Sequence, residues 1–251
     1  MNHLRGFIYW LLTTGPVGIL TGWVFRHRCF DCAGPVALPS EAKADIAGAI
    51  IFGVYEYPER ILIQRWLPRD KDCIELGCSI GIISRLILHK LEPTKRLVAV
   101  EASESLLELS RVNVAAAGHS SRFEAIHGAV HYQGDYVNFA EHGEHVRGKV
   151  AEEGNPSGIL TPCITLAKII QKHELGDFSL VMDIEGSEFD LVARDAPSLM
   201  NCQAIVAEVH GDDIKRKYFV EALQSEGFAL AEVKHAVFAF VRTHRSGASR
   251  L

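Results

Sequence analysis

Short apolar runs alternate along most of the chain with stretches whose apolar residues recur every three or four positions. A run of about five apolar residues is typical of a strand buried on both faces, and the longer spacing is typical of an amphipathic helix. Seven runs predict strands, at 72–76, 96–101, 122–130, 178–183, 204–210, 228–233 and 237–242. Because helical patterns separate the first five, we predict an α/β fold whose mostly parallel sheet ends in an antiparallel hairpin.

Two regions lie outside this alternation, residues 1–49 and residues 131–160. The stretch 33–47 is rich in glycine and proline, which predicts a linker with a short helix over 41–47. We therefore expect an N-terminal helical extension and linker over residues 1–49 and one main domain over residues 50–251. The stretch 131–160 is polar, interrupted by glycines and long for a loop, so we expect an insertion that acts as a lid.

Residues 7–25 carry no charged side chain and lie between basic residues. Their length is near the lower limit for a membrane span, and Trp10 and Trp23 are of the type that lies at membrane interfaces. Gly15 and Pro16 interrupt the middle of the stretch. Three interpretations stay open: helices packed on the domain or on a partner chain, which we favour; peripheral membrane contact; and a membrane span.

A glycine turn follows the first predicted strand. Gly77 and Gly81 bracket it, and glycine lets a backbone approach a ligand closely while the next helix offers unpaired N–H groups. The following strand ends in Glu101, 20 residues after Gly81, where dinucleotide-binding folds place a carboxylate that accepts hydrogen bonds from ribose hydroxyls. The turn lacks the three-glycine form that cradles a pyrophosphate. Together the turn and the carboxylate indicate a nucleotide-type site.

Acidic side chains and a histidine follow the two later strands. Asp183 ends the fourth strand, with Glu185 and Glu188 close behind, and Glu208 and His210 end the fifth. In open parallel sheets, ligands bind beyond the carboxyl ends of the strands. Glu188 also suits a helix N-terminus, where a negative charge complements the dipole, whereas a buried carboxylate at Asp183 needs a partner.

Composition narrows the choice of partner and compartment. At 251 residues and 27.7 kDa, the chain fits one α/β domain with a small N-terminal addition. Its net charge of −5 shows no basic footprint, so we expect no nucleic acid partner. Six cysteines in a chain this long do not form a disulfide scaffold, which favours a cytoplasmic setting, membrane-associated if residues 7–25 touch a bilayer. Association into a homo-oligomer stays open.

Four motifs together resemble one known family. Ile-Glu-Leu-Gly-Cys-Ser-Ile-Gly, Val-Ala-Val-Glu, Ile-Thr-Leu and Val-Met-Asp-Ile-Glu-Gly-Ser-Glu look like the FkbM family of S-adenosylmethionine-dependent O-methyltransferases. The resemblance covers about residues 50–242, and its most telling part is the Asp-x-Glu-Gly-x-Glu element at 183–188. Cys78 and Ser79 stand where the family usually has Ala-Asn, and Met182 replaces a common lysine.

The resemblance implies a Rossmann-like class I methyltransferase sheet and methyl transfer to a hydroxyl of a sugar, glycolipid or polyketide-like small molecule. The insertion 131–160 and the N-terminal helices are then expected to supply the pocket for this small-molecule or glycan acceptor. The glycine turn faces the methionine moiety, Glu75 meets its ammonium, Glu101 holds the ribose, and the end of the third strand borders the adenine. The cofactor-binding residues implied are Glu75, Gly77, Cys78, Ser79, Gly81, Glu101, Ala102, Gly128, Ala129 and Asp183.

A hydroxyl acceptor must lose its proton to a nearby base. We expect Asp183 as the first candidate and His210 as the second, since an unperturbed histidine has the better pKa for this task near neutral pH. We expect no metal ion. The alternative is a divalent cation such as magnesium, held by Asp183 and Glu185, that acidifies the hydroxyl.

Two other functional classes remain as alternatives. An NAD-dependent oxidoreductase needs a denser glycine turn and gives no role to the 183–188 element. A non-catalytic Rossmann-like binding subunit keeps the fold without turnover, and the departures at Cys78, Ser79 and Met182 are the only hints of it.

Overall fold

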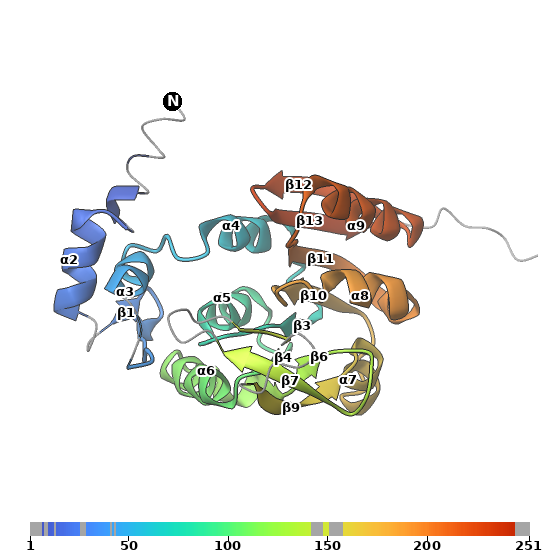
Figure 1. Ribbon diagram of the computed structural model, residues 1–251, viewed down its shortest axis with the longest axis horizontal. Coiled ribbons are helices and arrows are strands. Elements are labelled where there is room, and N and C mark those ends of the chain that lie inside the picture. The colour runs from blue at the N-terminus through green and yellow to red at the C-terminus, as the bar shows by residue number, and fades with distance from the viewer. Residues whose placement is uncertain are drawn as a thin grey trace, which may run out of the picture.

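The computed structural model describes residues 7, 10–12, 14–25, 29–40, 42, 44–141, 148–150 and 158–243. Its centre is a seven-stranded sheet in the order β12-β13-β11-β10-β3-β4-β5 (Figure 1). The strands are β3 (Asp72–Leu76), β4 (Leu97–Glu101), β5 (Phe123–His127), β10 (Phe178–Met182), β11 (Cys202–Glu208), β12 (Phe228–Lys234) and β13 (Val237–Arg242). All neighbours pair in parallel except β13, which is antiparallel to both β11 and β12. The predicted Rossmann-like sheet with its terminal hairpin is confirmed.

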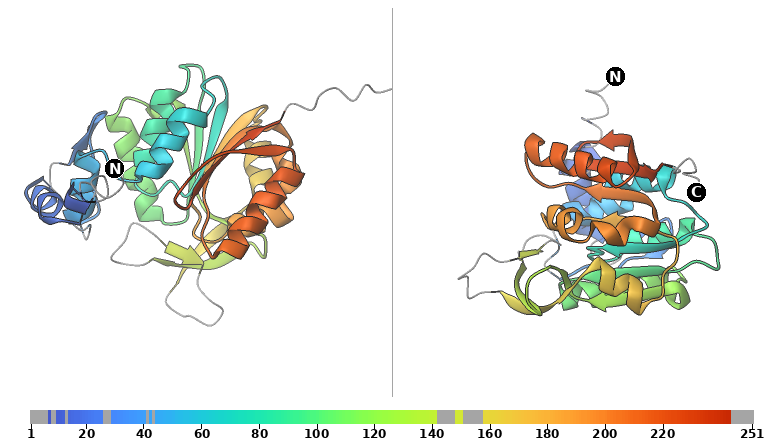
Figure 2. Two further views of the ribbon diagram at one scale, coloured as in Figure 1. Left: turned by 90° about the horizontal axis from the view of Figure 1, so that it is seen from above. Right: turned by 90° about the vertical axis from the view of Figure 1, so that its right-hand side faces the viewer.

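Helices cover both faces of this sheet (Figure 2). One face carries α4 (Tyr57–Trp66), α5 (Ile82–Lys90) and α6 (Glu104–Ala116), and the other carries α7 (Leu166–Lys172), α8 (Glu188–Arg194) and α9 (Asp213–Ser225). Short 3-10 turns lie at Ser120–Arg122 and Ala196–Asn201. Successive strand residues point to opposite faces, so Cys73 packs in one hydrophobic cluster and Ile74 in the other. Apolar runs are therefore buried on both sides.

Side-chain caps begin three of these helices. Ser103 accepts a hydrogen bond from the Leu106 N–H, Thr165 from the Lys168 N–H and Asp212 from the Lys215 N–H. Each satisfies an N–H that has no partner inside its own helix. The helices α6 and α9 directly follow β4 and β11, so their caps fix two of the chain segments that leave the central sheet at its carboxyl edge.

The third predicted strand is shorter than expected. It ends at His127, and Ala129–Val130 forms β6 in a second sheet of order β6-β9-β7-β8. The other strands of that sheet are β7 (Tyr136–Glu141), β8 (Gly148–Val150) and β9 (Ile159–Ile164). The expected insertion at 131–160 thus contains strands, while residues 142–147 and 151–157 lie outside the described residues.

The N-terminal part contains α2 (Pro16–Phe25), the two-residue strands β1 (Phe30–Asp31) and β2 (Gly34–Pro35), and α3 (Ala44–Ile51). The helix predicted over 41–47 is therefore shifted, and the boundary expected between residues 49 and 50 falls inside α3. Within the described residues, no helix is both long enough and apolar enough to cross a membrane.

The segment from β1 to α3 is packed onto the main domain. Cys29, Val36, Ala47 and Ile50 form a buried cluster with Ile80 and Ile82 at the start of α5. Arg85, buried in α5, donates to Asp31 Oδ1 at 2.8 Å and to the Pro35 carbonyl at 2.7 Å. If one partner of such a buried ion pair is removed, the other charge stays buried without a counter-charge and the fold is destabilised. This segment is therefore an integral part of the fold and not a linker.

Candidate active site

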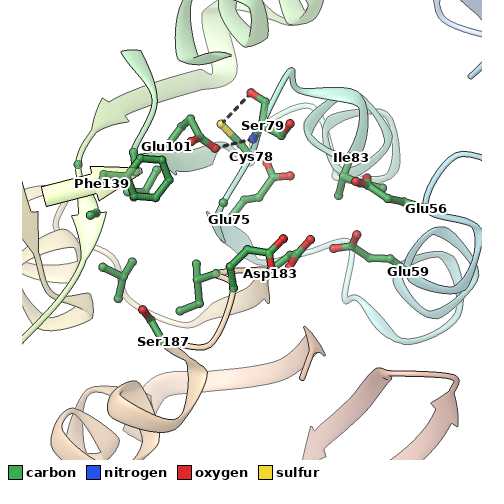
Figure 3. Close-up of a pocket in the computed structure, with 18 residues that line it drawn as sticks. Glu56, Glu59, Glu75, Cys78, Ser79, Ile83, Glu101, Phe139, Asp183 and Ser187 are labelled. Atoms are coloured by element: carbon green, nitrogen blue, oxygen red, sulfur yellow. Dashed lines mark hydrogen bonds between the residues drawn. The ribbon is translucent and has the colours of Figure 1, made fainter. Parts of the chain in front are cut away.

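A pocket opens where β3, β4 and β10 end, at the edge of the sheet expected for a ligand (Figure 3). It encloses about 810 Å³ of empty space, the part open to solvent included. Its lining residues are Glu56, Glu59, Glu75, Gly77, Cys78, Ser79, Ile83, Val100, Glu101, Ala102, Gly128, Ala129, Val130, Phe139, Asp183, Ile184, Glu185 and Ser187.

The glycine turn forms one wall of the pocket. The N–H groups of Gly77 and Cys78 both donate to the Val100 carbonyl of the neighbouring strand, at 2.9 and 3.1 Å. Gly77 has φ of 84°, and a Cβ at that position would lie 2.0 Å from the Asp183 carbonyl oxygen. Only glycine allows the turn to lie this close to the end of β10.

Glu101 is held in place by two backbone donors. The Ser79 N–H donates to its Oε2 at 2.8 Å, and the Ser103 N–H donates to its Oε1 at 2.9 Å. Ser79 itself has a positive φ of 48°, which turns its N–H toward the carboxylate. These two bonds orient the Glu101 carboxylate at the wall of the pocket.

The lining is strongly acidic. Six of the eighteen lining residues carry a carboxyl group, and none of these described lining residues is Lys, Arg or His. Glu75 is buried and bonded to the Ser84 hydroxyl at 2.5 Å; burial raises its pKa to about 8. Burial, helped by nearby carboxylates such as Glu56 and Asp183, also raises the pKa of Glu59 well above its usual value. Two desolvated acids that line the cavity favour a positively charged ligand.

Glu59 is the most unusual member of this set. It is only 4% exposed, lines the pocket and makes no hydrogen bond or ion pair within the described part of the chain. A buried carboxyl group without a partner is costly. Figure 3 shows its carboxyl group turned toward Asp183 across the cavity, where a ligand group would meet both.

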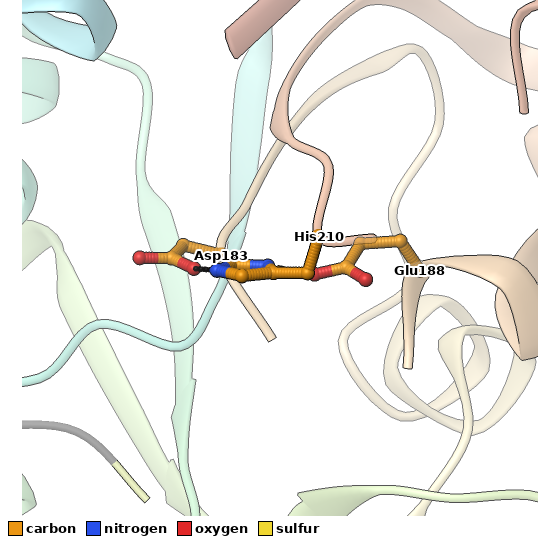
Figure 4. A group of neighbouring side chains, drawn as sticks. All are labelled: Asp183, Glu188 and His210. Atoms are coloured by element: carbon orange, nitrogen blue, oxygen red, sulfur yellow. Dashed lines mark hydrogen bonds and ion pairs between the residues drawn. The ribbon is translucent and has the colours of Figure 1, made fainter. Parts of the chain in front are cut away.

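His210 lies behind Asp183, two residues after the end of β11 (Figure 4). Its Nδ1 lies 3.0 Å from Oε1 of Glu188, a fully buried carboxylate at the start of α8. Its Nε2 lies 3.3 Å from Glu185 Oε2 and 3.7 Å from Asp183 Oδ1. The Glu188 hydrogen bond and the surrounding carboxylates raise the pKa of His210 to about 9. His210 was named as a candidate base on the ordinary pKa of a histidine, and the sequence did not show its pairing with Glu188.

Three of these side chains have the spacing of a metal site. Asp183, Glu188 and His210 each offer one ligand atom, and these atoms lie within 4.8 Å of one another. The sequence had paired Asp183 with Glu185 for this role. A histidine must be neutral to bind a metal ion, so the proton held at His210 opposes ligation here.

The structure gathers most of the predicted site residues around one cavity. Exceptions are Gly81, whose missing side chain makes room for α6 at Ser110, and His210, which contacts the lining from behind. The sequence analysis did not assign Glu56, Glu59 or Phe139 to the site, although the first two lie in the Tyr-Glu-Tyr-Pro-Glu stretch that leads into the first turn of α4. From residues 131–160, Phe139 alone is among the described lining residues, and none of residues 1–49 is.

Solved structures of similar fold include an O-methyltransferase from Bacillus cereus in complex with SAH, at 14% identity, covering 73% of this chain and 79% of that chain, with a TM-score of 0.46. Another is fibrillarin from Aeropyrum pernix with natively bound S-adenosyl-L-methionine, at 13% identity, 74% coverage of each chain and a TM-score of 0.47. A third is the ribosomal protein L11 methylase from Lactobacillus delbrueckii subsp. bulgaricus, at 12% identity, 75% and 79% coverage and a TM-score of 0.45.

Comparison with curated proteins finds no match. Residues 78–238, well over half of the chain, match the family model described as the methyltransferase FkbM domain. That match begins in the glycine turn, passes through Glu101 and the Asp183–Glu188 element, and ends in the terminal hairpin. The chain belongs to the FkbM methyltransferase family.

Proposed function

We propose that the protein transfers a methyl group from S-adenosylmethionine to a hydroxyl of a sugar, glycolipid or polyketide-like small molecule. The observation that supports this most is the composition of one cavity. The glycine turn and Glu101, held by the Ser79 N–H, line it, and so does Asp183 after β10, with His210 after β11 directly behind Asp183. Transfer to oxygen is favoured over nitrogen because Asp183-Ile-Glu-Gly186 lacks the Asn/Asp-Pro-Pro-Tyr type of motif.

The lining residues fit this methyl donor. S-adenosylmethionine supplies an electrophilic methyl group on a positively charged sulfur, and the acidic lining with its buried, unpaired Glu59 suits a cation. Glu101, oriented by the Ser79 and Ser103 N–H groups, accepts the ribose hydroxyls. Gly128 and Ala129 border the adenine, and Phe139 closes the same side of the pocket. These residues orient the donor, and orientation supplies much of the acceleration in a displacement reaction.

Proton removal from the acceptor falls to Asp183 or to His210. Asp183 lines the cavity directly, at the end of a central strand. His210 reaches the same place through Nε2, while Glu188 fixes its ring through Nδ1. With a pKa of about 9, His210 is mostly protonated at neutral pH in the empty pocket, so Asp183 is the preferred base.

Transfer without a metal ion is part of this proposal. The cluster of Asp183, Glu188 and His210 mixes nitrogen and oxygen ligands, whereas magnesium prefers oxygen ligands alone. The His210 ring is also already bonded to Glu188, one of the two carboxylates that a metal would need. Activity that survives EDTA supports the proposal, and activity lost to EDTA and restored by Mg²⁺ contradicts it.

Calorimetric titration of S-adenosylmethionine and SAH tests the donor assignment. Wild type is expected to bind both, and Glu101→Gln, which keeps the shape of the side chain, is expected to weaken binding at least tenfold. Glu108→Gln on the exposed face of α6 is the matched control and leaves affinity unchanged. No binding to wild type, or binding of NAD instead, would contradict the donor assignment.

A second assay separates an enzyme from a non-catalytic binding subunit. Formation of SAH is followed over a panel of sugars, glycolipids and polyketide-like alcohols. Turnover of a hydroxyl compound supports the proposed reaction. Donor binding without product over the whole panel favours the binding subunit.

A further inference from the structure

Helix α2 packs through its glycines and exposes its large apolar side chains. Gly15 and Gly18 are buried, and a Cβ at Gly48 of α3 would lie 2.3 Å from the Gly18 carbonyl oxygen. The two backbones therefore touch at this crossing. Ile19, Leu20, Trp23 and Val24 all lie on the outside of α2, with Leu20 63% and Trp23 68% exposed.

This arrangement is the reverse of an ordinary surface helix. A helix on a soluble domain turns its apolar stripe toward the core and its polar residues toward water. In α2 the buried Gly18 faces α3, and no residue from Pro16 to Phe25 carries a charge. Figure 2 shows α2 at one end of the molecule, with α3 between it and the main domain.

The exposed apolar surface extends beyond α2. Phe7 and Trp10 before the helix are exposed, with ring centroids 5.8 Å apart. Phe25 at its end meets Phe30 edge-on, and both are exposed. A contiguous apolar surface of this kind marks an interaction site, whereas single exposed apolar residues are common. Aromatic residues are the type enriched where protein meets the headgroup layer of a bilayer.

Charge identifies the kind of partner. Residues 1–30 contain Arg5, Arg26 and Arg28 and no Asp or Glu, a net charge of +3. Since the whole chain has 26 basic and 31 acidic residues, residues 31–251 carry 23 and 31, a net charge of −8. The apolar surface thus belongs to a positively charged end of an acidic protein. Residues 234–251 are also positively charged, with four basic and no acidic residues, but α2 lies within residues 1–30. A negatively charged surface would attract residues 1–30 and repel the acidic middle of the chain.

We propose that the outer face of α2, flanked by the arginines of residues 1–30, binds the surface of an anionic phospholipid membrane. The apolar side chains enter the headgroup boundary and the arginines meet lipid phosphates. The active-site pocket is close in the chain, because α3, against which α2 packs, ends only five residues before the lining residue Glu56. This inference is independent of the methyl-transfer proposal.

Co-sedimentation of the full chain with vesicles tests the inference. Vesicles of phosphatidylcholine with 30% phosphatidylglycerol are expected to bind the protein, and pure phosphatidylcholine vesicles are expected to bind it at least tenfold more weakly. Leu20→Ser with Trp23→Ser is expected to reduce binding to the anionic vesicles at least tenfold. Arg26→Gln with Arg28→Gln is expected to remove most of the preference for anionic lipid.

Two other exposed apolar residues provide the matched control. Met200 and Ile214 are 74% and 80% exposed and lie far along the chain from α2. Met200→Ser with Ile214→Ser is expected to bind vesicles like wild type. Circular dichroism and the melting temperature show whether each variant is folded.

Three results would overturn the inference. The first is a wild-type protein that stays in solution with both kinds of vesicle, and the second is a Leu20→Ser, Trp23→Ser variant that binds as well as wild type. The third is a self-associated wild type that becomes monomeric on this substitution, measured by analytical ultracentrifugation. In that case a second copy of the chain covers α2.

Discussion

His210 shows at the scale of one residue how a neighbour far away in the sequence sets chemistry. Four carboxylates face it, from Asp183, Glu185, Glu188 and Glu208, and Glu188 is the one hydrogen-bonded to its ring. Because Glu188 is fully buried, its negative charge is poorly screened and favours the protonated imidazole. Glu188 is thus a positioning residue that fixes both the ring and its proton.

Glu188→Gln is expected to lower the pKa of His210 by at least about one unit from its value of about 9. The change is read from the NMR titration of the histidine ring, with His210→Gln used to assign the signal. Asp190→Asn, two residues after Glu188 but on the exposed face of α8, is the control that leaves this pKa in place. An unchanged titration in Glu188→Gln would show that this carboxylate does not hold the proton.

The same pair decides which residue is the base. If His210 removes the proton, the rate rises with pH up to about 9, and Glu188→Gln moves this rise to lower pH. If Asp183 removes it, as preferred above, the rate shows no rise of this kind near pH 9. The pH–rate profile of wild type and Glu188→Gln distinguishes the two.

The raised pKa of His210 also links its charge to stability. A group whose pKa is higher in the folded state stabilises the fold below its unfolded pKa, about 6.5, and loses this contribution as pH rises through about 9. Since the side chain is one-quarter exposed, solvent reduces the effect to about 1–2 kcal/mol. Urea unfolding of wild type and His210→Gln at pH 6 and pH 10 measures it. A difference in unfolding free energy that does not shrink at the higher pH would refute the linkage.

At the scale of elements, the glycine turn and the end of β10 form one unit. The Gly77 backbone touches the Asp183 carbonyl, and the Asp183 N–H in turn donates to the Leu76 carbonyl at 3.0 Å. The position of the proposed base therefore depends on the glycine turn, which is proposed to face the cofactor. A change in the turn acts on both.

Gly77→Ala is expected to destabilise the protein by at least about 3 kcal/mol, through the positive φ and the contact of its new Cβ with the Asp183 backbone. Gly176→Ala is the matched control, since no atom lies within 4 Å of a Cβ there, and it is expected to change stability by less than about 1 kcal/mol. Urea denaturation of both variants gives the comparison. Equal stability of the two would mean that the turn can move away from β10.

The same scale shows what the sequence can and cannot reveal. The apolar runs predicted all seven strands of the main sheet, because the pattern of each strand is local and the central strands β3, β4, β10 and β11 are largely buried on both faces. The break at Gly128 was not predicted: a Cβ there would lie 3.2 Å from Ile164 of β9, a residue 36 positions further along the chain, so the glycine makes room for that strand. Glu59 in the pocket and Glu188 beside His210 were missed for the same reason, since their roles depend on contacts between distant elements.

At the scale of the whole molecule, five elements or loops bring six acidic groups to one cavity that has no basic side chain among its described lining residues. The methyl donor has a sulfonium charge that the product SAH lacks. At an effective dielectric constant near 20, a carboxylate several ångströms from the sulfonium contributes on the order of 1 kcal/mol to the binding free energy of the donor after screening. The pocket is therefore expected to bind S-adenosylmethionine about fivefold more tightly than SAH, which would favour product release.

Proton release gives the sharpest measurement of this charge balance. Glu75 has a pKa of about 8 and is mostly protonated at pH 7. Because a bound cation lowers this pKa, binding of S-adenosylmethionine should release protons from the protein, and binding of SAH should release fewer. Calorimetry in buffers of different ionisation enthalpy counts the protons, and the preference for the charged donor should grow as pH rises through 8. Glu75→Gln should reduce the release, while the exposed control Glu108→Gln should not. Equal proton release and equal affinity for the two ligands would mean that the acids do not sense the sulfonium.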